Sequence, residues 1–213
     1  ADGNEIKFCE PTGRSGTFVQ LNTDVITDAR TRYKEAIGRH ASRFPDLTFN
    51  FWKASFDAAR KLFFLANFMP HMILCLDRSG SIRWCEGLGP GCCGGIPYAL
   101  PNGLYVASGG CNGILSWFDA DGHILFQSVP HEGEGLRTAY SNELQILSDG
   151  RVLVGGGPGL AAYCADGPLL WVSKECSLRY CVDSANGLLA CCSWRKNENG
   201  EPNTAWLKVL DGL

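Results

Sequence analysis

Short apolar and alternating stretches, separated by turn residues, recur along the chain from residue 47 onward. They align as four units: SFDAARKLFFLANF with HMILCLDRSGSIRW, PYALPNGLYVASGG with NGILSWFDADGHILF, ELQILSDGRVLVGGG with GLAAYCADGPLLW, and YCVDSANGLLACCSW with NTAWLKVLDGL. Each unit predicts a strand, a turn, a second and more apolar strand, a connection, a third strand and another turn. A fourth strand follows in the first three units, so the pattern predicts repeated antiparallel sheets.

Glycine marks both turns of these units. The first turns contain Asn102-Gly103, Asp149-Gly150 and Asn186-Gly187, which are strong hairpin signals because these residues tolerate positive φ. The second turns carry Gly80, Gly122, Gly167 and Gly212, and an aromatic residue follows the first three by four positions, namely Trp84, Phe126 and Trp171. A period of roughly 40–50 residues with four strands per unit is typical of a β-propeller.

The two ends of the chain complement each other in this pattern. The last unit stops at the turn VLDGL, and the opening ADGNEIKFCE resembles the turn and strand that this unit lacks. We therefore predict an all-β propeller of about four blades, in which residues 1–10 close the last blade and residues 47–213 form the blades. The alternative is part of a larger propeller, and an eight-bladed ring of two copies is a variant of it.

Residues 11–46 do not follow the repeat and predict an amphipathic helical insertion. Thr23 and Asp24 are suited to cap a helix. Apolar residues then fall on one face at helical spacing: Val25, Ile26, Ala29, Tyr33, Ala36 and Ile37. Such a helix either packs on the propeller or docks a partner or an anionic ligand.

Composition narrows the function classes. The chain has 213 residues, 45% of them hydrophobic, and a net charge of −3. This charge argues against nucleic-acid binding, and no apolar run reaches the roughly 20 residues needed to span a bilayer. The 11 cysteines leave the compartment open. Cysteines inside strand-like runs favour reduced thiols and a cytoplasmic protein, whereas a removed signal peptide before Ala1 would mean a secreted or periplasmic one.

The most specific local motif is Gly89-Pro-Gly-Cys-Cys-Gly-Gly95. Cys92 and Cys93 can form a strained vicinal disulfide, and such strain tends to occur at functional sites. The motif lies where the chain would enter the inner strand of the second unit, near a propeller's central channel. It resembles the loop of the quinoprotein alcohol dehydrogenases that carries a vicinal disulfide against their quinone cofactor. That resemblance implies redox chemistry and a bound quinone.

The blade phrases ALPNGLYVASGG and LSDGRVLVGGG also resemble the repeats of aryl-sulfotransferase-like propellers. Those enzymes place histidines on inner strands, where this chain has Pro97-Tyr98 and Asn142-Glu143. The comparison favours redox chemistry over sulfotransfer. No zinc-type set of cysteines and histidines is present, so no metal site is predicted.

Further site candidates fall in the segments that join the units. His131, beside Glu132 and Glu134, is a candidate acid–base group together with the two cysteines. The candidate ligand-binding residues are Arg137, Arg179, Tyr98 and Asn142. Two arginines can hold a carboxylate, sulfate or phosphate through paired hydrogen bonds.

Two functions follow from these features. The first is a propeller that binds a small molecule, a protein partner or a second propeller chain, either by itself or as a non-catalytic subunit of a larger assembly. The alternative is an enzyme, or enzyme subunit, with its site at the channel mouth.

Overall fold

The computed structural model describes residues 5–9, 15–20, 24, 27–28, 31, 51–67, 71–88, 95–109, 114–128, 144–156, 159–173, 180–183, 189–195 and 204–210. Seventeen strands lie within these ranges: β1 (Glu5–Cys9), β2 (Ser15–Gln20), β3 (Phe51–Asp57), β4 (Leu62–Asn67), β5 (Met72–Leu76), β6 (Ile82–Gly87), β7 (Tyr98–Ala99), β8 (Tyr105–Ser108), β9 (Leu115–Phe118), β10 (Ile124–Ser128), β11 (Leu144–Ile146), β12 (Val152–Gly156), β13 (Gly159–Tyr163), β14 (Leu169–Ser173), β15 (Tyr180–Asp183), β16 (Leu189–Arg195) and β17 (Thr204–Leu210). The prediction of an all-β chain is confirmed.

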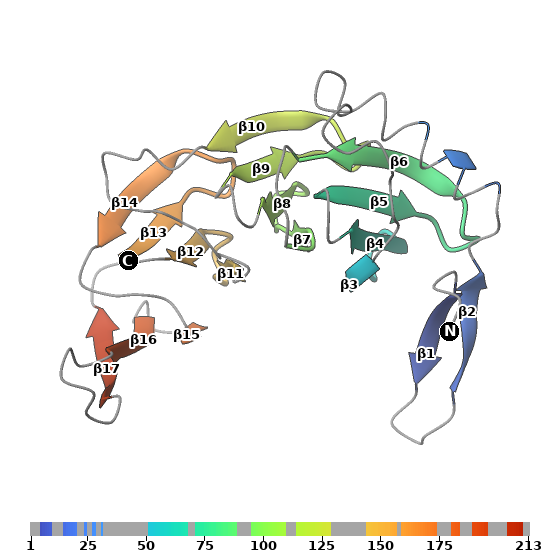
Figure 1. The fold of residues 1–213 in the computed structure, drawn as a ribbon. Coiled ribbons are helices and arrows are strands. Elements are labelled where there is room, and N and C mark those ends of the chain that lie inside the picture. The colour runs from blue at the N-terminus through green and yellow to red at the C-terminus, as the bar shows by residue number, and fades with distance from the viewer. Residues whose placement is uncertain are drawn as a thin grey trace.

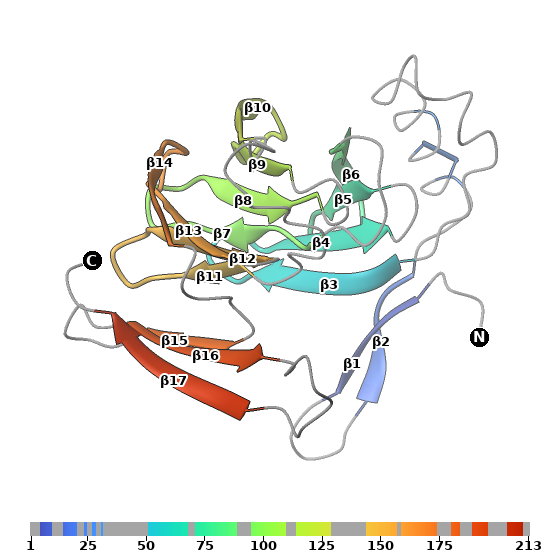
Figure 2. The same cartoon turned by 60° about the vertical axis from the view of Figure 1, so that its left-hand side comes forward.

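The strands form sheets that match the sequence units. Blade 1 (β3–β6), blade 2 (β7–β10) and blade 3 (β11–β14) are antiparallel four-stranded sheets in chain order, and blade 4 (β15–β17) has three described strands. The sheets follow an arc, with β3, β7 and β11 on its concave side and β6, β10 and β14 on its outer side (Figure 1). Blade 4 and the β1–β2 hairpin lie beyond the two ends of this arc (Figures 1 and 2).

Apolar side chains fill the spaces between neighbouring blades. One cluster joins blades 1 and 2 through the buried residues Phe64, Ile73, Cys75, Trp84, Leu88, Tyr105, Ala107 and Phe118. A second cluster joins blades 2 and 3 and is centred on Trp117, whose ring meets those of Phe126 and Tyr163. Because side chains alternate along a strand, the two middle strands of blade 2, β8 and β9, each contribute to both clusters.

The predicted turns adopt the expected conformation. Gly103 and Gly150 have φ values of +90° and +87°, and Gly122 and Gly167 have values of +88° and +119°. Blade 1 has Lys61 at the position of the first-turn glycines, and its φ of 57° is the only positive value of a non-glycine residue in the described ranges. A side chain in this conformation costs roughly 1–2 kcal/mol.

The periodic aromatic residues lock one blade to the next. The ring of Trp84 in blade 1 lies against Gly122 of blade 2, where an added Cβ would be 2.7 Å from Cδ2 of the indole. Its Nε1 donates a hydrogen bond to the Ala120 carbonyl at 2.8 Å. Phe126 of blade 2 lies in the same way against Gly167 of blade 3. The sequence period therefore encodes a contact between successive blades.

The first strand pairs differently from the prediction. β1 pairs with β2 in an antiparallel hairpin, from Glu5 opposite Gln20 to Cys9 opposite Ser15, and β17 pairs only with β16 in the described sheets. A hairpin between neighbouring strands needs a much shorter loop closure than pairing the two ends of the chain, and short loops lose less entropy.

Within the predicted insertion over 11–46, residues 15–20 form β2, ahead of the helix start predicted at Thr23 and Asp24. This stretch contains Thr17, Phe18 and Val19, residue types that favour strands. Further along, Asp24, Thr27, Asp28 and Thr31 are helical, and the hydroxyl of Thr31 donates to the Thr27 carbonyl at 3.1 Å. In the part of the chain that is described, no helix is long and apolar enough to cross a membrane.

Candidate functional site

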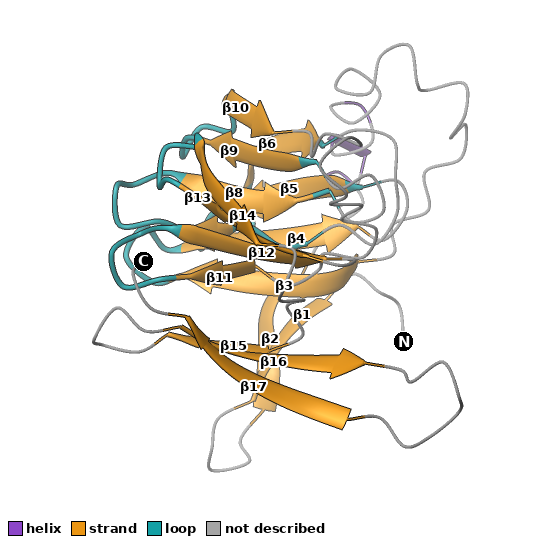
Figure 3. Cartoon of the chain, turned by 90° about the vertical axis from the view of Figure 1, so that its left-hand side faces the viewer, coloured by secondary structure: helices purple, strands orange, loops and turns teal. Residues whose placement is uncertain are grey.

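The blades present two unlike ends. At the turn end, short turns join β3 to β4 and β5 to β6, and the equivalent strands in blades 2 and 3; these turns gather on one side of the molecule (Figure 3). The opposite end, called the connection end here, has the segments between successive blades, which are residues 88–97, 129–143 and 174–179. The two ends therefore differ in the length of the chain segments that join their strands.

Carboxylates at the turn end are bound within their own turns. Asp77 accepts hydrogen bonds from the backbone N–H groups of Ser79 and Ser81, and its bond from the Ser79 hydroxyl holds the Asp77 pKa below its ordinary value. Asp149 pairs with the guanidinium of Arg151 at 2.6 Å, which likewise lowers the pKa of Asp149. These groups stabilise turns and leave little capacity for a ligand.

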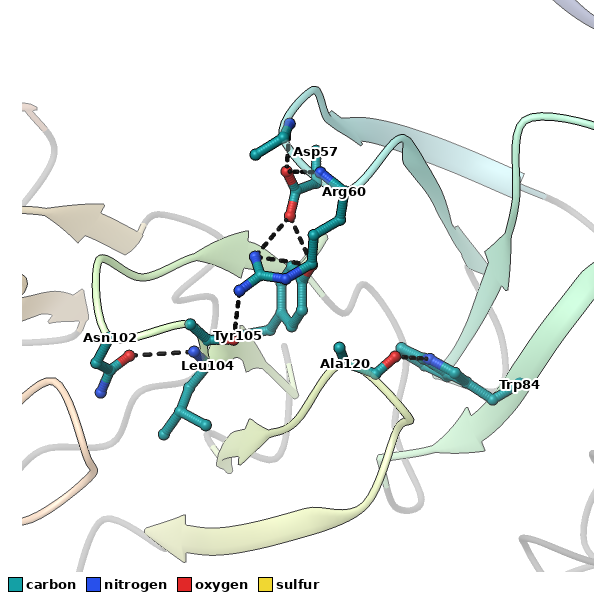
Figure 4. A network of polar contacts seen from close by, with 9 residues as sticks. Asp57, Arg60, Trp84, Asn102, Leu104, Tyr105 and Ala120 are labelled. Atoms are coloured by element: carbon teal, nitrogen blue, oxygen red, sulfur yellow. Dashed lines mark hydrogen bonds and ion pairs between the residues drawn. The ribbon is translucent and has the colours of Figure 1, made fainter.

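The strongest polar network at the turn end joins blades 1 and 2 (Figure 4). Oδ2 of Asp57 accepts the Tyr105 hydroxyl at 2.6 Å and Nη1 of Arg60 at 3.0 Å. Nη2 of Arg60 continues to the Gly103 carbonyl at 3.1 Å. Burial opposes ionisation of Asp57, but these hydrogen bonds outweigh it and lower the pKa of the carboxyl. Burial and the Asp57 charge together raise the pKa of Tyr105.

Replacing Tyr105 by phenylalanine should lower the free energy of unfolding by about 2 kcal/mol, because hydrogen bonds to charged groups contribute roughly 1.5–3 kcal/mol. Urea unfolding of the Tyr105→Phe and Asp57→Asn variants and of the double variant measures the coupling between the two side chains. Additive losses would show that the 2.6 Å contact does not hold the blades together.

Four asparagine, histidine and serine side chains are fully buried in the described ranges and lie toward the connection end of blades 1 and 2: Asn67, His71, Ser108 and Ser116. Among the described residues, Nδ1 of His71, Oγ of Ser108 and Nε1 of Trp117 have no hydrogen-bond partner. Nε2 of His71 lies 3.3 Å from the Gly95 carbonyl, which can only accept, so this nitrogen carries the proton. Burial lowers the pKa of His71 to about 4, so the imidazole is neutral at pH 7.

Of the predicted site residues, the structure describes Tyr98 alone. Tyr98 begins the inner strand of blade 2, as predicted, and is half-buried against the cluster between blades 2 and 3. The other candidates lie outside the described residues: Cys92, Cys93, His131, Arg137, Asn142 and Arg179. Among the described cysteines, Cys75, Cys85 and Cys164 are free thiols, and the described residues contain no group of three or more metal-binding side chains.

From the sequence alone, His71 is expected only to begin a strand, and nothing there predicts its contact with Gly95. The available signal is its position directly before the fully apolar run Met72–Leu76, since a polar residue next to a buried strand needs a partner. Its partner is 24 residues away, in the segment that leads into the next blade, and a local pattern does not reveal this contact.

No protein-family model and no curated protein matches the chain. Solved structures share its fold. Streptogramin B lyase superposes with a TM-score of 0.56 at 14% identity, covering 98% of this chain and 62% of the lyase. The β-propeller domain of Cps50 (Swd1) from Myceliophteria thermophila gives 0.56 at 14% identity, covering 90% and 60%. A putative 6-phosphogluconolactonase from Bacteroides uniformis gives 0.56 at 13% identity, covering 97% and 65%.

These likenesses and the sheet order define the class of the protein as a β-propeller. At such low identities they define the fold alone, and the chain spans about three fifths of the length of the structures that it matches. The function must therefore be argued from its own residues.

Proposed function

We propose that the protein is a propeller-type binding module that recognises a small anionic molecule at its connection end. The observation that supports this is the contrast between the two ends of the blades. The turn-end carboxylates Asp57, Asp77 and Asp149 are bound by neighbouring protein groups. Two of the three buried polar atoms without partners among the described residues, Nδ1 of His71 and Oγ of Ser108, lie toward the connection end of blades 1 and 2.

The anionic class of ligand follows from the arginines. Arg60 and Arg151, at the turn end, are both paired with carboxylates. Arg137 and Arg179 belong to the segments that join blade 2 to blade 3 and blade 3 to blade 4. We assign them to the anion, with Tyr98 and Asn142 as the polar and aromatic groups at the entrances of blades 2 and 3.

Isothermal titration with sulfate, phosphate and citrate, each in a chloride-containing buffer, tests the proposal. We expect one of these anions to bind, and we expect Arg137→Ala and Arg179→Ala each to weaken that binding at least about tenfold, as for the loss of a charge-assisted hydrogen bond. Arg151→Ala is the matched control, because it removes the same charge at the turn end. Absence of binding by all three anions, or an equal loss in the Arg151 variant, would overturn the assignment.

A second function, redox catalysis like that of the quinoproteins, attaches to Cys92 and Cys93 with His131 as the acid–base group. It is favoured by one contact: the segment that carries both cysteines ends at Gly95, which is held by a buried histidine. An absorption spectrum of protein from its native source separates the two functions. A bound quinone chromophore would favour the enzyme, and its absence together with anion binding would favour the module.

A further inference from the structure

Both ends of the segment 89–94 meet at His71. The N–H of Leu88, just before the segment, donates to the backbone carbonyl of His71 at 3.2 Å. The carbonyl of Gly95, just after it, accepts from Nε2 of the same histidine at 3.3 Å. His71 therefore holds the residue before the segment, Leu88 (the entry), through its backbone, and the residue after it, Gly95 (the exit), through its side chain.

The exit has a second anchor in blade 2. The N–H of Gly95 donates to the carbonyl of Ser108 at 2.8 Å. A Cβ at position 95 would lie 2.6 Å from Oγ of Ser108, and the next described atom is 3.5 Å away. Both polar backbone groups of Gly95 are thus held by buried residues, and only glycine fits at this point.

The His71 imidazole is suited to hold Gly95 because it is fully buried. Among the described groups, only the Gly95 carbonyl accepts a hydrogen bond from the ring. The Gly95 carbonyl fixes the proton on Nε2, and no described group competes for it. The burial of His71 strengthens this hydrogen bond and makes its loss costly.

We propose that His71 is a positioning residue that ties together Leu88 and Gly95, the two residues that flank segment 89–94 with Cys92 and Cys93. Its importance for recognition rests on the proposed function, but the tie itself does not. A loop whose ends are fixed to the scaffold loses less entropy when it binds a ligand.

Hydrogen exchange and thiol alkylation of the reduced protein test the tie without any ligand. In His71→Ala, we expect amide exchange in residues 88–97 and alkylation of Cys92 and Cys93 to accelerate about tenfold, as for loss of one buried hydrogen bond. His71→Gln keeps an amide donor near the position of Nε2 and should restore most of the protection. His123→Ala is the control, since His123 is exposed at the turn end.

The alkylation rate of Cys75 distinguishes loosening of residues 88–97 alone from unfolding of the whole blade. Cys75 reacts slowly in the folded protein because it is fully buried and its burial raises the pKa of the thiol to about 12. Unchanged labelling of Cys75 in His71→Ala is expected. A parallel rise at Cys75, or no change in residues 88–97, would overturn the proposal. So would a failure of His71→Gln to restore protection.

Gly95→Ala tests the same tie if His71→Ala does not fold. The new Cβ should displace the exit and accelerate exchange in 88–97, and adding Ser108→Ala should reverse this because it removes the only described atom closer than 3.5 Å. Slow exchange in Gly95→Ala, or no reversal in the double variant, would contradict the tie. Anion titration of the same variants is read separately, so failure of anion binding would count against the proposed function alone.

Discussion

The Gly167→Ala variant is expected to lose about 4 kcal/mol of its free energy of unfolding, a large part of the stability of a typical domain. At φ +119° an L side chain is strained, which costs roughly 1–2 kcal/mol. The added methyl group would also overlap the ring of Phe126 from blade 2, and overpacking of this kind costs roughly 1–3 kcal/mol. Urea unfolding followed by circular dichroism measures the change.

Gly103→Ala is the matched control for this variant. Gly103 has a φ of +90°, but among described atoms its Cβ would meet only the flexible end of Arg60, at 3.1 Å. It should therefore lose only the roughly 1–2 kcal/mol due to backbone strain. Equal losses at positions 167 and 103, or an unchanged loss in Gly167→Ala when Phe126 is also replaced by alanine, would show that the aromatic contact is not the cause.

Stability should fall by about 3 kcal/mol between pH 6.5 and pH 4 because of His71 alone. The pKa of His71 is about 4 in the folded protein against an ordinary value of 6.5. Between these two pH values the unfolded chain binds a proton at His71 and the folded protein does not, which favours unfolding. The stability that His71 contributes as a neutral group is present above pH 6.5. It is lost progressively as the pH falls from 6.5 to 4 and changes little below that. The measurement is the free energy of unfolding in urea at several pH values, for the native protein and for His71→Gln.

The difference between the two pH curves isolates His71, because both proteins share the same carboxylates. The curve of His71→Gln should be flatter over this range, whereas that of His123→Gln should not be flatter than the native curve. Burial is absent at His123, and its hydrogen bond with Asp119 raises the pKa instead. Parallel curves for the native protein and His71→Gln would contradict the depressed pKa, and NMR titration of the His71 ring checks it directly.

The blades could be predicted from the sequence because their signals are local. Apolar strands, Asn-Gly and Asp-Gly turns and a regular period each depend on a few neighbouring residues, and the observed turns at Gly103 and Gly150 follow them. The contacts of Trp84 with Gly122 and of Phe126 with Gly167 were visible only as a period, since each contact joins residues of different blades. The pairing of β1 with β2 was hidden for another reason: the resemblance of 1–10 to a missing strand competed with a closer partner in 15–20.

The candidate site was predictable in outline only. Adjacent cysteines in a glycine-rich segment are conspicuous in any sequence, and the segment does lie between blades 1 and 2. The importance of His71 depends on two contacts, one to Leu88 and one to Gly95, that exist only after both blades have formed. Spacing along the chain carries no information about such a contact, because the same histidine would begin a strand equally well without it.

The contact between an aromatic ring and the glycine of the following blade gives the array a polarity. Gly122 of blade 2 contacts Trp84 of the preceding blade, whereas Phe126 of blade 2 contacts Gly167 of the following blade. The two flanks of blade 2 are therefore different. Stability in such an array is shared mainly between nearest neighbours, as in a row of coupled units. Each contact between an aromatic ring and the next blade's glycine therefore lets one folded blade stabilise the following one. Damage to a single glycine would therefore divide the cooperative unit at that contact, while the blades on either side keep their own sheets.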